Sequence, residues 1–279
     1  MTLLAPFARH YRGPVAVASK ALTARLLLVA AALVTCTASG CAKSTAERGL
    51  GLWQERCKTS GEFIHKVVED VDGIFLLTLR TTLNFDDQYR LDDPYGSDSI
   101  GTDYILNFLQ GFYYQPPNAR PQGFPPRTGY RFVEARDSED GQLYRYTGRY
   151  EEPWQANKSY LKGYVRFVLD RTLIRTSSAR YGVRFDDIST RTDREHWIAG
   201  SSLKVVDLQT QAVIGERLGY MIDLAQGSRA KQRSPWLLAA NNACPSFDRN
   251  YPGRVPVPGA ALQGGQTLDF VEKVLRPSK

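Results

Sequence analysis

SLKVVDLQTQAVIGERLGYMID, residues 202–223, is the stretch that decides the fold, because it predicts two β-strands joined at Gln209, Thr210 and Gln211. β-Branched and aromatic residues, which favour strands, also dominate three other runs. These are GYRFVEAR (129–136), QLYRYTGRY (142–150) and YLKGYVRFVLD (160–170). The chain is therefore expected to be a strand-dominated α+β domain, built on an antiparallel sheet or sandwich.

A hairpin is expected near the start of the domain. The runs FIHKVV (63–68) and IFLLTLR (74–80) flank Asp72-Gly73, a dipeptide that favours tight turns. The two runs are therefore predicted to pair with each other across that turn.

Helices are expected at both ends of the domain and briefly at residues 104–109. Ser44 with Glu47 forms a capping-box pattern, and apolar residues at helical spacing follow it as far as Cys57. A short C-terminal helix is expected at residues 268–275. Both terminal helices are expected to pack at the edge of the sheet.

The N-terminus has the three parts of a secretory signal. Residues 1–25 carry four basic and no acidic residues, and the apolar run LLLVAAALV (26–34) leads into TASGC (37–41). The apolar run is shorter than the roughly 20 residues that a membrane-spanning helix needs. The run ending at Cys41 resembles the lipobox of bacterial lipoproteins, in which the cysteine is lipidated and becomes the first mature residue.

The lipobox resemblance implies a domain organisation and a location. Residues 1–40 are expected to be the signal peptide, 41–45 a lipidated tether and 46–279 a single periplasmic domain held at a membrane. Ala42, in place of aspartate, favours the outer membrane. An ordinary signal peptide, with Cys41 as a spare thiol, is the alternative.

The charge balance of the mature chain argues against a nucleic-acid partner. Four of the 36 lysines and arginines lie in the signal, which leaves 32 basic against 29 acidic residues. No run of basic residues resembles a phosphate-binding arm. Nucleic acid is therefore excluded as an expected partner.

Two cysteines, Cys57 and Cys244, remain after the signal is removed and Cys41 is lipidated. In an exported protein two leftover thiols most simply form a disulfide. Two separate buried thiols are the alternative.

Motifs that carry chemistry are missing from the sequence. It has no H-E-x-x-H, no G-x-S-x-G, no Walker loop and no dinucleotide-binding glycine pattern. His65 is expected to be structural. At His196 a structural hydrogen bond is favoured over a triad with Ser201 and one of the acidic residues Asp193 and Glu195. The chain is therefore expected not to be an enzyme, with no catalytic residue, metal or cofactor.

Two irregular segments interrupt the strands, and both are rich in aromatic residues. NFDDQYRLDDPYGSDSIGTD (84–103) is acidic, and GFYYQPPNARPQGFPPRTGY (111–130) alternates aromatic residues with proline and glycine. Long irregular segments in a compact domain are usually functional or disordered. The acidic segment is open to three interpretations: a solvated loop, a partner-binding surface, or a calcium or two-carboxylate site.

Several runs together resemble a known group of proteins. They are W-x-x-R-C-x-x-x-G-E-x-I-x-x-x-V-x-x-V-x-G-I (53–74), DDPYG (92–96), YGVRFDDIST (181–190), REHWIAGSSLKVVDLQT (194–210) and SPWLLAANNACPSF (234–247). The set is similar to lipoproteins encoded beside phospholipase effectors of the bacterial type VI secretion system, the lipase-immunity group. The resemblance implies a tethered periplasmic binder that neutralises a cognate lipase.

A binder of this kind needs a preformed surface with aromatic anchors and complementary charge. The surface is predicted to lie on the two irregular segments, at Tyr89, Asp92, Asp93, Tyr95, Phe112, Tyr113, Tyr114 and Phe124. A structural or assembly lipoprotein of the envelope or secretion machinery is the alternative function. A periplasmic hydrolase that uses the acidic segment is a third.

Overall fold

The computed structural model describes residues 44–80, 87–91, 95–96, 98, 101–109, 129–151, 166–247 and 259–278. The predicted signal peptide and Cys41 lie outside these residues. Within these ranges, no helix combines the length and the hydropathy needed to cross a bilayer.

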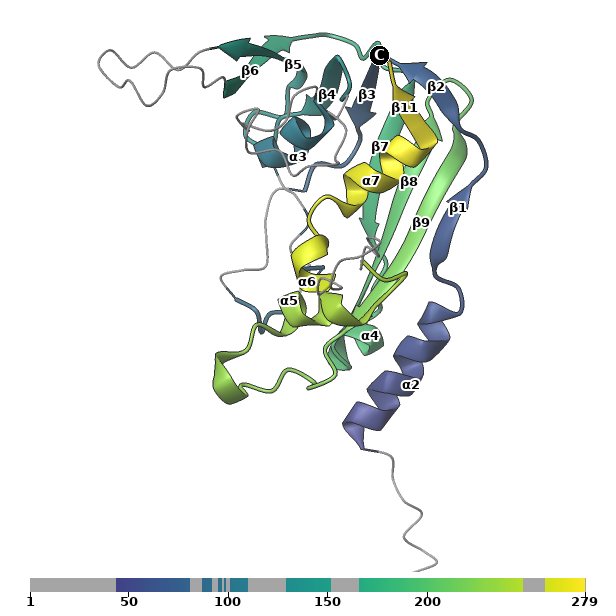
Figure 1. The fold of residues 1–279 in the computed structure, drawn as a ribbon, viewed down its shortest axis with the longest axis vertical. Helices are drawn as coiled ribbons and strands as arrows, with labels where there is room; N and C mark the ends of the chain where they lie inside the picture. The colour runs from purple at the N-terminus through teal and green to yellow at the C-terminus, as the bar shows by residue number, and fades with distance from the viewer. Residues whose placement is uncertain are drawn as a thin grey trace, which may run out of the picture. The chain divides into compact units, whose positions relative to one another are not determined.

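One large mixed sheet dominates the domain (Figure 1). Its strands run in the order β1-β9-β8-β7-β3-β4-β5-β6, and β10 also pairs with β9. Their bounds are β1 Gly61–Ile64, β3 Gly73–Leu76, β4 Phe132–Arg136, β5 Leu143–Glu151, β6 Arg166–Leu173, β7 Tyr181–Asp187, β8 Ile198–Asp207, β9 Ala212–Ile222 and β10 Ala243–Cys244. A second, two-stranded sheet joins β2 (Val68–Val71) to β11 (Leu275–Pro277) in parallel.

The strand-dominated α+β class predicted from the sequence is confirmed, but the large sheet is mixed rather than antiparallel. Its central strand β3 runs parallel to both of its neighbours, β4 and β7. Parallel pairing needs a long crossover, and the chain between β3 and β4 is long enough to supply one. The other neighbouring pairs of the sheet are antiparallel.

The hairpin predicted around Gln209–Gln211 is confirmed. β8 and β9 pair antiparallel from Asp207 opposite Ala212 to Ile198 opposite Ile222. Gln211 takes a positive φ of 61° in the turn between them. These two long strands lie near one side of the sheet and carry most of the helix packing described below.

The hairpin predicted around Asp72-Gly73 is wrong. β1 pairs with β9, β2 pairs with β11, and β3 enters the centre of the large sheet. Gly73 begins β3 where a Cβ atom would collide with the ring of Phe132, so this glycine permits a close strand contact. The Asp72-Gly73 dipeptide thus marks the passage from the small sheet to the large one.

The helices are α2 (Thr45–Cys57), α3 (Gly101–Phe108), α4 (Arg191–Glu195), α5 (Pro235–Ala239), α6 (Gly259–Leu262) and α7 (Gln266–Val274), with 3₁₀ turns η3 (Ala230–Gln232) and η4 (Ala240–Asn242). The helices expected at the two ends and at residues 104–109 are thereby confirmed, with bounds shifted by a few residues. The short helices α4, α5 and α6 were not predicted.

The terminal helices pack on opposite faces of the sheet rather than at its edge. Leu203 and Val205 of β8 belong to the main core, which includes Phe270 and Val274 of α7. Gly215 on β9 allows this close packing, because a Cβ atom there would lie 2.7 Å from Val274. On the other face, a second cluster of Ile198, Tyr220 and Ile222 packs against Leu52 and Trp53 of α2. Burial from both sides explains why nearly all of β8 is buried.

Candidate interaction surface

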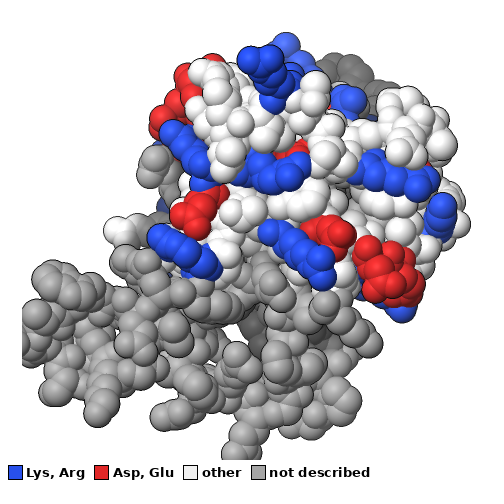
Figure 2. Space-filling model, turned by 90° about the horizontal axis from the view of Figure 1, so that it is seen from above, with Lys and Arg blue, Asp and Glu red and all other residues white. Residues whose placement is uncertain are grey.

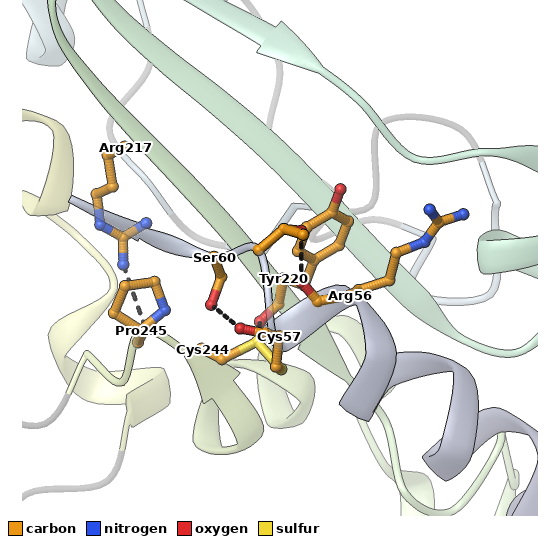
Figure 3. The surroundings of a disulfide bond; sticks show 8 residues. Arg56, Cys57, Ser60, Arg217, Tyr220, Cys244 and Pro245 are labelled. Carbon is orange, nitrogen blue, oxygen red and sulfur yellow. Dashed lines mark hydrogen bonds between the residues drawn. A yellow bond between two sulfur atoms is a disulfide. The ribbon is translucent and has the colours of Figure 1, made fainter. Parts of the chain in front are cut away.

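The disulfide predicted between Cys57 and Cys244 is present in the structure (Figure 3). The two Cα atoms lie 5.6 Å apart although the cysteines are 187 residues apart in sequence. The bond joins the last residue of α2 to β10, which pairs with β9. Ser60 closes the helix end by donating a hydrogen bond of 2.9 Å to the carbonyl of Cys57. The disulfide therefore holds the first helix of the domain to its C-terminal half.

A second link ties α2 to α4. Arg56 Nε donates to Asp193 Oδ1 over 3.0 Å, and the Asp193 side chain is fully buried. The hydrogen bond that Arg56 donates to this carboxylate raises the pKa of the Arg56 guanidinium. Asp193 also accepts from the backbone N–H of Thr190, which completes the capping box at the start of α4.

His196 makes a structural contact rather than a triad contact. Its Nδ1 lies 3.0 Å from the carbonyl oxygen of Thr192, one helical turn earlier, so the ring donates there when that nitrogen is protonated. Asp193 is already engaged by Arg56 and Thr190. The neighbouring polar residues are thus used to hold α4 between α2 and β8.

Three aromatic side chains gather at the α5 end of the sheet. Trp197 stacks on the fully buried Trp236, with ring centroids 4.8 Å apart, and Tyr89 meets the edge of Trp197 at 6.3 Å. Trp197 takes a positive φ of 57°, which is unusual for a bulky residue. The guanidinium of Arg229 lies 4.0 Å above the ring of Tyr89.

Residues 87–91 of the acidic segment are fastened to α5 by hydrogen bonds. The Oε1 atom of Gln88 accepts from the backbone N–H groups of Trp236 and Leu237, both at 3.1 Å, and so caps the start of α5. Trp236 Nε1 donates to the carbonyl of Arg90 over 2.7 Å. The Tyr89 hydroxyl donates to the carbonyl of Arg233 over 3.3 Å. This part of the segment is an integral piece of the fold.

Arg233 and Asp223 stabilise the loop that leads from β9 to α5. Arg233 Nη2 lies 2.5 Å from Asp223 Oδ1, and the Asp223 side chain is almost completely buried. The hydrogen bonds that Arg233 donates to Asp223 raise the pKa of the Arg233 guanidinium. Their pairing neutralises the charge that the buried carboxylate would otherwise leave in the interior.

The predicted binding residues have different positions in the structure. Tyr89 is half-buried, and its ring and hydroxyl are both used inside the domain. The prediction that Tyr95 is a surface anchor is wrong. Its side chain is 1% exposed and packs edge-on against Phe185 in the core. The remaining predicted residues, Asp92, Asp93, Phe112, Tyr113, Tyr114 and Phe124, lie outside the described residues.

Two of the described aspartates of the acidic segment have structural partners. Asp87 accepts from the backbone N–H of Tyr89 over 2.9 Å, and the buried Asp98 accepts from the hydroxyl of Thr267 at the start of α7. Over the part of the chain that the structure describes, no group of three or more His, Cys, Asp or Glu side chains is placed to hold a metal ion.

Charges of both signs are interspersed on the face shown in Figure 2. Ion pairs with exposed members join neighbouring elements, such as Arg276 with Glu69 at 2.7 Å and Arg171 with Asp137 at 2.9 Å. Exposed pairs of this kind add little to stability but keep opposite charges close together.

Exposed apolar side chains gather on β1 and just after it, in the FIHKVV run that the sequence predicts to be a strand but not a binding surface. Phe63, Ile64 and Val67 are 42%, 39% and 43% exposed, and Val213 on the neighbouring strand β9 is 39% exposed. The FIHKVV pattern could have indicated this exposure, because its apolar residues do not alternate as they do in a strand with one buried face.

Comparison of the chain with protein-family models, with curated proteins and with solved structures finds no match.

Proposed function

We propose that this chain is a periplasmic lipoprotein, anchored to a membrane through Cys41, that binds and neutralises a phospholipase effector of the type VI secretion system. One observation carries the proposal. The runs that resemble lipase-immunity lipoproteins are scattered between residues 53 and 247, and parts of three of them lie together at the α2–α4–α5 end of the sheet. Cys57 bonds Cys244 there, and Trp197 stacks on Trp236. Such convergence supports treating the runs as one shared framework rather than as separate chance similarities.

The disulfide supports the periplasmic location in the proposal. Disulfides form and persist in oxidising compartments such as the bacterial periplasm and are rare in the cytosol. This bond joins the first helix of the domain to a strand near its C-terminal end. A domain closed in this way suits export followed by oxidation.

A membrane tether suits the proposed target. A phospholipase acts at the bilayer surface, so an inhibitor held on the same surface meets it where its substrate lies. Lipid anchoring by more than one acyl chain is stable, whereas a single chain binds only marginally. The domain itself then needs only a rigid surface that fits the enzyme.

The experiment that tests the proposal uses the full chain and the product of the gene next to its own, which the proposal expects to be a phospholipase. The two are co-expressed in the periplasm of a host, and the cells are assayed for survival and for co-purification of the two proteins. Survival together with a stable complex is expected. A Cys41→Ser control reports on the anchor, and its protection should fall while binding in detergent extracts persists. If the wild-type chain neither binds the enzyme nor protects the cells, the proposal is wrong.

A further inference from the structure

The first turn of α2 lies against the loop that leads from β9 to α5 (Figure 1). A Cβ atom added to Gly49 would lie 3.0 Å from the side chain of Gln226. Residues 224–232 of this loop, which we call the basic loop, have the sequence LAQGSRAKQ and contain no acidic residue. Two segments that are far apart in the sequence therefore form one end of the domain.

The base of the basic loop is fixed by hydrogen bonds. Gln226 Nε2 donates to the carbonyl oxygens of His196 over 2.9 Å and of Asp223 over 3.1 Å. The backbone N–H of Gly227 donates to the carboxylate of Asp223 over 2.9 Å. A loop that is held at its base presents the residues at its tip with a small entropic cost on binding.

Basic residues outnumber acidic residues at this end of the domain. In the segments 44–50, 87–91 and 224–232, the exposed basic residues are Arg48, Arg90, Arg229 and Lys231, and the exposed acidic residues are Glu47 and Asp87. Arg48 and Lys231 form no ion pair with any residue that the structure describes. Arg229 lies over the ring of Tyr89 instead of beside a carboxylate. This excess of positive charge differs from the face shown in Figure 2, where charges of both signs are interspersed.

Exposed leucines accompany these basic residues. Leu224, the first residue of the basic loop, is 49% exposed, and Leu50 of α2 and Leu91 are each 37% exposed. Basic side chains are attracted to the anionic headgroups of a bilayer, and apolar side chains among them insert between the headgroups. The residues at this end therefore match the chemistry of an anionic lipid surface.

The proposed lipid anchor brings a bilayer to the same end of the domain. Cys41 precedes Thr45 by four residues, and four extended residues span at most about 14 Å. Thr45 begins α2 one turn, or about 6 Å, before Gly49, which adjoins the basic loop. A lipid on Cys41 therefore keeps the bilayer surface within about 20 Å of Gly49.

We propose that the basic loop and the first turn of α2 form a second membrane contact, at which Arg48, Arg229 and Lys231 bind the phosphate groups of anionic lipids. The inference rests on the Cys41 anchor of the proposed function and not on the identity of the protein partner. A single tether leaves the domain free to rotate above the bilayer. The second contact turns one end of the domain toward the bilayer and leaves its other surfaces to the protein partner.

The experiment uses the full lipidated chain in vesicles of phosphatidylcholine alone, or of an equal mixture of phosphatidylcholine and phosphatidylglycerol. Mass spectrometry first establishes that Cys41 carries lipid. Hydrogen exchange of the backbone amides is then measured in the basic loop, with the exposed residues 138–142 as the internal control.

Two double variants with the same change in charge are compared with the wild type. Arg229→Glu with Lys231→Glu reverses the charge of the basic loop, and Lys66→Glu with Arg175→Glu does so at exposed residues elsewhere. The midpoint of thermal unfolding, measured in detergent, shows whether each variant is folded.

We expect exchange in the basic loop of the wild type to be at least about fivefold slower in the mixed vesicles, which is the factor that one basic residue contributes at an anionic surface. Exchange in residues 138–142 should not change. The slowing should disappear in 1 M salt, where the Debye length is about 3 Å. It should also be lost in the variant of the basic loop and be kept in the control variant.

The outcomes separate this inference from the proposed function. Equal exchange in the two kinds of vesicle, in a chain with lipid on Cys41, overturns the second membrane contact and leaves the proposed inhibitor in place. Loss of the slowing in the control variant as well overturns its assignment to the basic loop. A chain without lipid on Cys41 overturns both the contact and the anchor. Slowed exchange in a chain that does not bind the product of the neighbouring gene supports the contact and counts against the inhibitor.

Discussion

Replacing both Cys57 and Cys244 by alanine removes the one covalent link between α2 and the C-terminal half of the domain. The cysteines are 187 residues apart. The loop-closure entropy that a link of this length removes from the unfolded chain corresponds to about 5 kcal/mol at 25 °C. Native domains are stable by about 5–15 kcal/mol in total, so the disulfide accounts for a large share of the free energy of unfolding.

The native structure should survive the substitution, because α2 has other contacts. Arg56 stays paired with the buried Asp193, and Leu52 and Trp53 stay packed on the second cluster of the sheet. The effect is therefore expected mainly in the unfolded state. Residual structure in that state reduces the entropy gain, so we expect a loss of about 3–5 kcal/mol.

Urea unfolding, followed by tryptophan fluorescence and far-UV circular dichroism, measures this loss. The oxidised wild type, the wild type in reducing agent and the double variant are compared. The reduced wild type should match the double variant. A difference below about 1 kcal/mol between oxidised and reduced protein, with native spectra in both, would refute the reasoning from loop length.

Three further predictions concern stability. Arg56→Met leaves the buried carboxylate of Asp193 without its guanidinium partner and should lower the free energy of unfolding by about 2 kcal/mol. Arg191→Ala breaks the exposed pair with Glu195 and should change the free energy of unfolding by less than about 0.5 kcal/mol. The same urea titration measures both. Gly51 lies in an open position of α2, so Gly51→Ala should raise the unfolding midpoint because alanine favours helix. Gly227→Ala should lower the unfolding midpoint, because Gly227 has a φ of 69° and adjoins the ring of Trp197. Burial raises the pKa of Glu134, but donated hydrogen bonds outweigh burial and lower the pKa below its ordinary 4.5. The stability that this carboxylate provides is therefore present above pH 4.5 and is lost as the pH falls through the lowered pKa. Between pH 4.5 and lower pH, the free energy of unfolding should consequently fall less for Glu134→Gln than for the wild type.

Local pattern was sufficient for the elements whose pairing is also local. The hairpin of β8 and β9 joins strands that are adjacent in sequence, and each strand is long and rich in β-branched residues. The terminal helices have helical spacing over at least two turns. Elimination was sufficient for the disulfide, because only two cysteines remain once the predicted signal and the predicted lipidation site Cys41 are set aside.

Local pattern failed where the partner of a segment is distant. The turn-like Asp72-Gly73 lies between strands that find their partners at β11, β4 and β7. Tyr95 was expected at the surface, since tyrosine among proline and glycine gives no information on the direction of its side chain. Its burial follows from packing against Phe185, which lies 90 residues later.

The sequence by itself determined the strand-rich class, the two terminal helices, the β8–β9 hairpin and the pairing of Cys57 with Cys244. Each follows from residue spacing or residue count, and neither quantity depends on what else the segment touches. Only the tertiary structure decided that β3 lies at the centre of a mixed sheet, that Tyr95 is buried and that the apolar side chains Phe63 and Ile64 of β1 are exposed. Burial and exposure are properties of the whole set of contacts around a side chain, and most of those contacts come from distant parts of the chain.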